Sequence, residues 1–246
     1  MKPLRARFAK DIVAEFLPSK KPSKKVIIFT SGMPSVPKLT EVLNFYSKKG
    51  FWVFHPRYRG SWESSGSFLK HSPEKDLLDV IDGILNGFTD ILNKKKYSIK
   101  FKKLYLFGGS FGGPAAILAS RDQRVNKAIA LSPVIDWGHL GRAEPIDEVL
   151  KYTREAFGEA YRINNSNWEK LKSGSFYSPA YHAKEIDGSK LLIFQAKDDE
   201  SIPWKPTVKF CRSTGTKLEL WKKGGHLSSS MFMNPRIHKN IKSFLK

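Results

Sequence analysis

The stretch LYLFGGSFGG (residues 104–113) decides how the rest of the chain is interpreted. An apolar strand leads into a G-x-S-x-G turn, and the small residues from Pro114 to Ser120 then predict a helix. This order is typical of a nucleophile elbow, in which the serine, here Ser110, stands above a sheet on a sharp strand-to-helix turn. A side chain at Gly108 or Gly112 would collide with the neighbouring strand or helix. A Gly-rich turn with a serine also occurs as a plain loop, so the assignment depends on its context.

The context is an alternation of apolar runs and helical patterns. Further strands are expected at 26–29, 51–54, 128–131, 191–194 and 218–221, with a short edge strand at 7–16. Helical spacing of apolar residues appears at 39–46, 77–88 and 235–244. Such alternation predicts an α/β fold with a mainly parallel sheet and helices on both of its faces. Ligands of these sheets bind at the carboxyl ends of the strands, which is where Ser110 falls.

The alternation lapses between residues 134 and 189. The aromatic residues of this segment are Trp137, Tyr152, Phe157, Tyr161, Trp168, Phe176, Tyr177 and Tyr181. A connection this long between two strands predicts a helical cap over the site rather than a plain loop. Most of its aromatics are expected to pack the cap onto the body, and Trp137 and Tyr152 are candidates for substrate contact. The 246 residues are thus expected to form one domain with a cap insertion at 134–189.

Charge and composition exclude several other classes. The formal charge is +20, but the lysines are spread along the chain and accompany no nucleic-acid motif, which favours a solvated basic surface. Cys211 is the single cysteine, and the histidines lack metal-ligand spacing, so neither a disulfide, a metal nor another cofactor is expected. No signal peptide and no membrane-spanning stretch is apparent, which leads us to expect a cytoplasmic protein without a membrane or specific nucleic-acid partner.

Three reactive groups follow one another in the order that α/β-hydrolases use. Ser110 comes first, an acid follows a later strand, and His226 comes after the last strand. His226 would take the Ser110 proton and return it to the leaving group, and the acid would hold the imidazole in the right tautomer. The residues alone leave three acids open, namely Asp198 and Asp199 after the strand at 191–194, and Asp136 after the strand at 128–131.

The segments 108–113, 58–61 (YRGS) and 196–203 (AKDDESIP) resemble the α/β-hydrolase superfamily, most closely the catalytic domain of prolyl oligopeptidase-like serine hydrolases. The resemblance implies an α/β-hydrolase fold from about residue 25 onward. It also implies that Asp199 is the acid, because the acid of that family precedes an apolar residue and a proline at this spacing. The oxyanion donors would be the backbone N–H groups of Phe111 and Met33. The chain departs from the family at Ser31-Gly32, where a His-Gly pair is common, and at 195–196.

Three functions are consistent with these residues. The first is hydrolysis of small carboxylic esters through an acyl-enzyme on Ser110, and the second is a peptidase that uses the same groups on short peptides. The third is a non-catalytic binding scaffold, which has no reason to retain all three reactive groups. Peptidases of the resembled family generally carry a large N-terminal propeller domain, whereas about two dozen residues precede the strand at 26–29. We therefore expect esters to be the preferred substrates.

Overall fold

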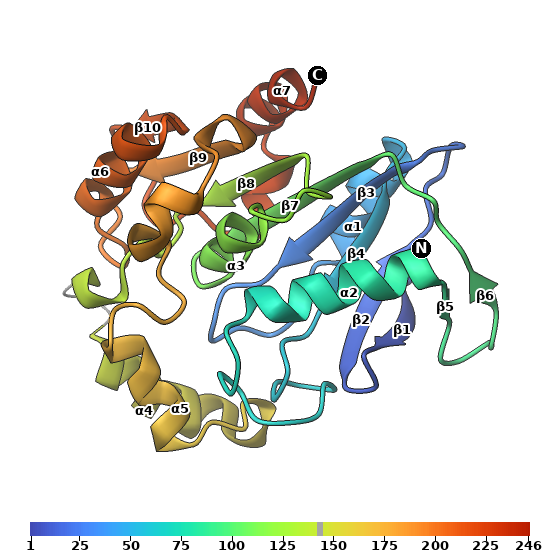
Figure 1. Cartoon of the computed structure of the whole chain (residues 1–246), viewed down its shortest axis with the longest axis horizontal. Helices are drawn as coiled ribbons and strands as arrows, with labels where there is room; N and C mark the ends of the chain where they lie inside the picture. Colours follow the sequence, from blue (N-terminus) through green and yellow to red (C-terminus); the bar gives the residue numbers. More distant parts are fainter. Residues whose placement is uncertain (142–144) are drawn as a thin grey trace.

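The computed structural model describes residues 1–141 and 145–246. Within these ranges the chain builds an eight-stranded sheet in the order β1-β2-β4-β3-β7-β8-β9-β10 (Figure 1). Its strands are β1 (Leu4–Phe8), β2 (Ile12–Leu17), β3 (Lys25–Thr30), β4 (Trp52–Pro56), β7 (Lys103–Gly109), β8 (Lys127–Leu131), β9 (Leu191–Ala196) and β10 (Lys217–Trp221). The short strands β5 (Phe88–Thr89) and β6 (Lys96–Tyr97) form a separate antiparallel pair. The α-helices are α1 (Thr40–Lys48), α2 (Glu74–Asn86), α3 (Gly112–Ala119), α4 (Ile146–Phe157), α5 (Asn165–Lys172), α6 (Trp204–Thr214) and α7 (Pro235–Phe244).

The sheet is parallel from β4 to β10 and antiparallel at its amino-terminal edge, where β1 pairs with β2 and β2 with β4. The expectation of one edge strand over 7–16 is therefore wrong. Ala9 and Lys10 have φ angles of 46° and 69°, and this left-handed backbone cannot continue a strand, so the chain reverses there. The resulting hairpin places β1 at the edge and β2 inside the sheet.

Alternate residues of the central strands enter two separate hydrophobic cores. In β7, Leu104 and Leu106 face one core and Tyr105 and Phe107 face the other. Buried residues of α2, α3 and α6 belong to the first core, and those of α1 and α7 belong to the second. Side chains of a strand point to opposite faces, so the two groups of helices cover opposite faces of the sheet. The α/β class with a mainly parallel sheet and helices on both faces is confirmed.

The connecting segment (residues 134–189) adds no strand to the sheet in its described part, and its residues 142–144 lie outside the described residues. Figure 1 shows its helices α4 and α5 (yellow) set apart from the sheet. Backbone hydrogen bonds tie it to the loop after β4: the Trp62 N–H bonds to the Ala160 carbonyl at 2.7 Å, and the Arg162 N–H bonds to the Gly60 carbonyl at 2.8 Å. These bonds position α4 relative to the ends of the strands.

Candidate active site

Ser110 stands at the turn between β7 and α3 with a φ of 50°. Positive φ is strained for a residue with a side chain, and it persists only where the surroundings hold it. Here the Ser110 N–H bonds to the Leu131 carbonyl at 2.9 Å. A Cβ atom on Gly108 would lie 2.3 Å from the Gly112 oxygen, and one on Gly112 would lie 2.5 Å from the Thr30 oxygen. The predicted steric need for glycine at both positions is confirmed.

His226 lies in the loop after β10, and its ring contacts the carboxylate of Asp199 in the loop after β9. Nδ1 of His226 is 3.0 Å from Oδ2 and 3.2 Å from Oδ1 of Asp199. An ionised carboxylate only accepts hydrogen bonds, so Nδ1 of His226 carries a proton. The Asp199 side chain is fully buried, whereas the His226 ring is 31% exposed and accessible to a reactant.

The carboxylate of Asp199 also accepts hydrogen bonds from other groups. The backbone N–H groups of Ser201 and Ile202 bond to Oδ1 at 3.1 and 2.9 Å, and the Gln195 amide bonds to Oδ2 at 3.1 Å. Burial by itself raises the pKa of Asp199. The hydrogen bonds from His226 and the Ile202 N–H outweigh it, so that the pKa lies below its usual value. Asp199 is therefore a fixed negative charge behind the histidine.

The other two acids make different contacts. Asp198 is exposed, as expected, and its Oδ1 accepts the N–H groups of Gly224 and Gly225 at 2.9 Å each. It thus holds the loop that carries the histidine. Asp136 accepts the N–H of Gly138 at 2.9 Å and caps the 3₁₀ helix η1 (Trp137–His139), and its Oδ2 lies 2.9 Å from Nδ1 of His139. Of the three candidates, the structure brings only Asp199 to the ring of His226.

A cavity of about 680 Å³ opens at the carboxyl ends of the strands. Its lining residues are Ser31, Gly32, Met33, Pro34, Ser35, Val36, Lys38, Leu39, Gly109, Ser110, Glu148, Val149, Tyr152, His226, Leu227, Ser228, Ser229 and Ser230. Ser110, His226 and Met33, which are far apart in the sequence, therefore face one space. Most of the lining is apolar or carries hydroxyl groups.

The expected oxyanion residues flank Ser110. Phe111 follows it directly and is the N-cap residue of α3, where the first N–H groups of a helix have no partner within the helix. On the other side, a Cβ atom on Gly32 would lie 3.3 Å from Cβ and 3.8 Å from Oγ of Ser110, so the loop after β3 passes close to the serine. Met33 is the next residue of that loop and lines the cavity.

The two aromatic candidates of the connecting segment have different surroundings. Tyr152, on α4, lines the cavity and is 57% exposed. Trp137 is 7% exposed and does not line the cavity; its indole N–H bonds to the Tyr177 carbonyl at 2.9 Å. Its ring packs against that of Phe111 with the centroids 5.6 Å apart. The placement of Trp137 as a substrate contact is thus corrected: it is a core residue that supports the elbow.

One polar contact at the cavity was not anticipated. Oγ of Ser31 lies 2.6 Å from Nε2 of His55, a fully buried histidine on β4. The only signal in the sequence was Ser31 itself, at the position where the family has a histidine, and nothing pointed to His55 as its partner.

Over residues 1–141 and 145–246, no three His, Cys, Asp or Glu side chains come together as a metal site. None of the helices in the described part of the chain combines the length and apolar character needed to cross a bilayer.

Comparison with protein families identifies the family of this chain. The model of the prolyl oligopeptidase family matches residues 37–245. The chain belongs to the prolyl oligopeptidase family. The resemblance drawn from the elbow and the segment 196–203 is therefore confirmed, and the chain is a member of a serine hydrolase family. No curated protein sequence matches the chain.

Solved structures of this fold include both esterases and peptidases. The esterase Pf2001 of Pyrococcus furiosus is similar with a TM-score of 0.69 at 16% identity, over 99% of this chain and 89% of that one. The α/β hydrolase GrgF of Penicillium sp. sh18 gives a TM-score of 0.67 at 17% identity, over 96% of this chain and 93% of that one. The acylaminoacyl peptidase of Pyrococcus horikoshii gives 0.62 at 18% identity, over 99% of this chain and 39% of that one.

Proposed function

We propose that the protein hydrolyses carboxylic esters through an acyl-enzyme on Ser110. The observation that carries this proposal is that Ser110 and His226 line one cavity while Asp199 holds the histidine through Nδ1. Nucleophile, base and orienting acid are thereby supplied by three loops at one end of the sheet. A binding scaffold would have no use for the buried, hydrogen-bonded Asp199 behind an accessible His226.

The reaction then follows from the positions of the protons. Oγ of Ser110 attacks the ester carbonyl carbon while Nε2 of His226 takes the hydroxyl proton, which gives a tetrahedral oxyanion and an imidazolium. Asp199 stabilises the imidazolium through Nδ1. As the tetrahedral species collapses, the C–O bond to the leaving group breaks and His226 returns the proton to the alkoxide. Water then attacks the acyl-enzyme by the same two steps, which frees the acid and restores Ser110.

The backbone N–H groups of Phe111 and Met33 would bind the oxyanion. Both belong to segments that lie next to Ser110, and neither contribution depends on the identity of the side chain. The loss of one such donor typically costs about 3 kcal/mol of transition-state stabilisation.

The cavity lining supports esters over peptides. Within the described ranges 1–141 and 145–246, the charged lining side chains outside the reactive groups are Lys38 and Glu148. Both are exposed, and the remaining lining suits a small neutral substrate. An alkoxide or phenoxide also leaves more readily than an amine, which must first be protonated. We therefore infer a preference for short acyl or aryl esters. Tyr152 on α4 would contact the substrate from the connecting segment.

A peptidase is the second candidate. Glu148 is the one carboxylate that lines the cavity among the residues that the structure describes, and it would pair with the free amino terminus of a short peptide. The P. horikoshii acylaminoacyl peptidase shares the fold, although this chain spans 39% of its length.

We further propose that the chain is one α/β-hydrolase domain in which residues 134–189 cap the site. The approach of α4 to the cavity through Glu148, Val149 and Tyr152 supports this reading.

A substrate panel tests the assignment. Purified protein is assayed against p-nitrophenyl esters of increasing acyl length and against aminoacyl and peptidyl amides. We expect short esters to exceed amides in kcat/KM by at least about a hundredfold, which corresponds to roughly 2.7 kcal/mol. A fluorophosphonate probe should label the wild type but not a folded Ser110→Ala variant. An amide with a kcat/KM equal to that of the best ester would favour the peptidase instead. Labelling of Ser110→Ala would show that another residue is the nucleophile.

A further inference from the structure

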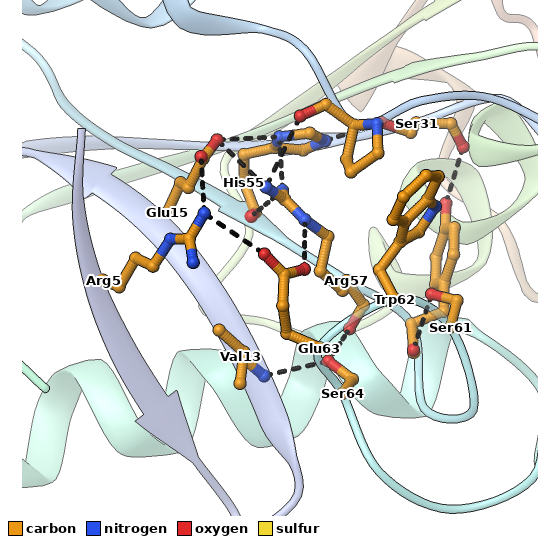
Figure 2. A network of polar contacts seen from close by, with 12 residues as sticks. Arg5, Val13, Glu15, Ser31, His55, Arg57, Ser61, Trp62, Glu63 and Ser64 are labelled. Carbon is orange, nitrogen blue, oxygen red and sulfur yellow. Dashed lines mark hydrogen bonds and ion pairs between the residues drawn. The ribbon is translucent and has the colours of Figure 1, made fainter. Parts of the chain in front are cut away.

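A buried polar network connects the amino-terminal edge of the sheet with the proposed oxyanion loop (Figure 2). His55, on β4, is its centre and has no exposed surface. Nε2 of His55 lies 2.6 Å from Oγ of Ser31, and Nδ1 lies 2.8 Å from an NH1 nitrogen of Arg57. Both ring nitrogens are thus engaged, one by a hydroxyl and one by a guanidinium.

The guanidinium determines which nitrogen of His55 carries the proton. Arg57 can only donate hydrogen bonds, so Nδ1 must accept from it and cannot itself be protonated. The carboxylate of Glu15 is no competing acceptor, because its Oε2 lies 3.9 Å from Nδ1, beyond hydrogen-bond distance. Burial, together with the neighbouring Arg57 charge, lowers the pKa of His55 to about 4, against the opposing effect of Glu15. His55 is therefore neutral, with its one proton on Nε2.

Arg57 is itself fixed in place. Its NH2 nitrogen lies 3.1 Å from Oε2 of Glu15, and its Nε lies 3.4 Å from Oε2 of Glu63. NH1 also donates to the His55 carbonyl oxygen at 3.0 Å. Two carboxylates on one side and His55 on the other hold a guanidinium that is 4% exposed. The tautomer of His55 is thus set by the buried guanidinium of Arg57.

The tautomer of His55 determines the direction of the Ser31 hydroxyl proton. Because Nε2 of His55 donates to Oγ, the hydroxyl proton of Ser31 points away from the ring. Oγ has no second hydrogen-bond partner among the residues that the structure describes. The backbone of Ser31 is anchored as well, since the Tyr58 hydroxyl donates to its carbonyl oxygen at 3.0 Å. Ser31 lines the cavity, and the next residue, Gly32, lies against Ser110.

We propose that the Ser31 hydroxyl donates a side-chain hydrogen bond to the oxyanion, beside the N–H groups of Phe111 and Met33. Ser31 is then a further catalytic residue, and His55 and Arg57 are positioning residues that keep its proton directed toward the substrate. The inference rests on the proposed acyl transfer at Ser110. A hydroxyl that accepts from His55 is a better donor than a free one, because the two bonds polarise each other.

A matched set of Ser31 variants tests the proposal. Ser31→Ala and Ser31→Val remove the hydroxyl, and Ser31→Thr keeps it in the shape of valine. On the best p-nitrophenyl ester we expect Ala and Val to lower kcat by about tenfold to a hundredfold with little change in KM, since the lost bond forms only in the transition state. The inhibition constant of an alkyl trifluoromethyl ketone, which forms an oxyanion on Ser110, should rise by the same factor. Thr should exceed Val in kcat by about tenfold.

The role of His55 needs a measurement that a purely structural residue would not affect. His55→Gln keeps an N–H donor and His55→Leu removes it. We expect His55→Leu to lower kcat when Ser31 is present. In the Ser31→Ala background it should cause no further loss of kcat, because His55 acts through the Ser31 hydroxyl. Additive losses would show that His55 only supports the fold.

The outcomes separate the two proposals. If the wild type hydrolyses esters and Ser31→Ala or Ser31→Val retains full kcat and inhibitor affinity, the inference about Ser31 is overturned while the esterase stands. Equal kcat values of the Thr and Val variants would overturn it even if Ala fails to fold. If the wild type neither hydrolyses esters or amides nor reacts with fluorophosphonate at Ser110, the proposed function fails, and the role of Ser31 fails with it.

Discussion

Oδ2 of Asp199 lies 3.0 Å from Nδ1 of His226, although 27 residues separate the two in the chain. β9 and β10 pair in parallel, so the loops that follow them leave the sheet at the same edge and bring the two side chains together. The contact makes Asp199 the group that sets the tautomer of the proposed base.

Replacing Asp199 by asparagine is expected to lower kcat by about 10³- to 10⁴-fold, because an amide cannot stabilise the imidazolium and favours the wrong tautomer. Steady-state ester hydrolysis measures the loss, and the melting temperature confirms that the variant is folded. Asp136→Asn serves as the control, since Asp136 caps η1 and pairs with His139 rather than with His226, and it should leave kcat unchanged. A large loss at Asp136 with none at Asp199 would show that another acid serves His226.

Substitutions at Asp198 should separate the acceptor oxygen from the charge. Its Oδ1 accepts two backbone N–H groups of the loop that carries His226. Asp198→Asn keeps an oxygen acceptor and should lower stability only slightly. Asp198→Ala leaves both N–H groups without their acceptor. We expect the Ala variant to lose about 1 kcal/mol of unfolding free energy, measured in urea, with a several-fold lower kcat. Equal losses in both variants would mean that the negative charge itself matters.

The elbow glycine Gly108 should not tolerate a side chain. A Cβ atom there would lie 2.3 Å from the Gly112 oxygen and 2.6 Å from the Thr30 hydroxyl, inside van der Waals distance. We expect Gly108→Ala to lower the unfolding free energy by about 3 kcal/mol or more. The matched control is Gly215→Ala, where φ is +71° but nothing lies within 4 Å, so that only about 1 kcal/mol of backbone strain is added. Similar losses at the two positions would contradict the steric argument.

The buried His55 should make stability depend on pH. Its pKa falls from 6.5 to about 4 on folding, so the unfolded chain binds the proton more readily than the folded one. The resulting stability is fully present above pH 6.5 and is lost as the pH falls toward 4. When the pH is lowered from 8 to 4.5, we expect the free energy of unfolding of the wild type to fall by about 2 to 3 kcal/mol more than that of His55→Gln. Urea titrations at the two pH values measure the difference. Parallel pH profiles of the two proteins would contradict a neutral, buried His55.

Tyr152 and Trp137 should differ in what they control. Tyr152 is 57% exposed on the cavity, so Tyr152→Ala should change the preference among acyl chain lengths without changing stability. Trp137 is 7% exposed and packs on Phe111, so Trp137→Ala should lower the unfolding free energy by about 3 to 5 kcal/mol. Ester panels and urea titrations of both variants measure the two effects. If Trp137→Ala changed the substrate specificity and kept full stability, Trp137 would be a substrate contact and not a core residue.

The sequence by itself determined what depends on short-range backbone and patterning rules. The apolar runs and helical spacings predict the α/β alternation, and the glycines around Ser110 predict the elbow because only glycine fits where Cβ atoms would meet neighbouring backbone. The order of Ser110, acid and His226 is equally visible, since each follows a strand. These features are set by residues close together in the chain, where periodicity and steric limits act directly.

Only the tertiary structure decided which distant residues meet. The order of strands places Glu15 of β2 opposite His55 of β4, and β4 next to β3, whose end leads into Ser31. The packing of the connecting segment likewise buries Trp137 while it leaves Tyr152 at the cavity. No local pattern encodes these contacts, because each depends on which strands pair in the sheet and on how the intervening chain packs against it.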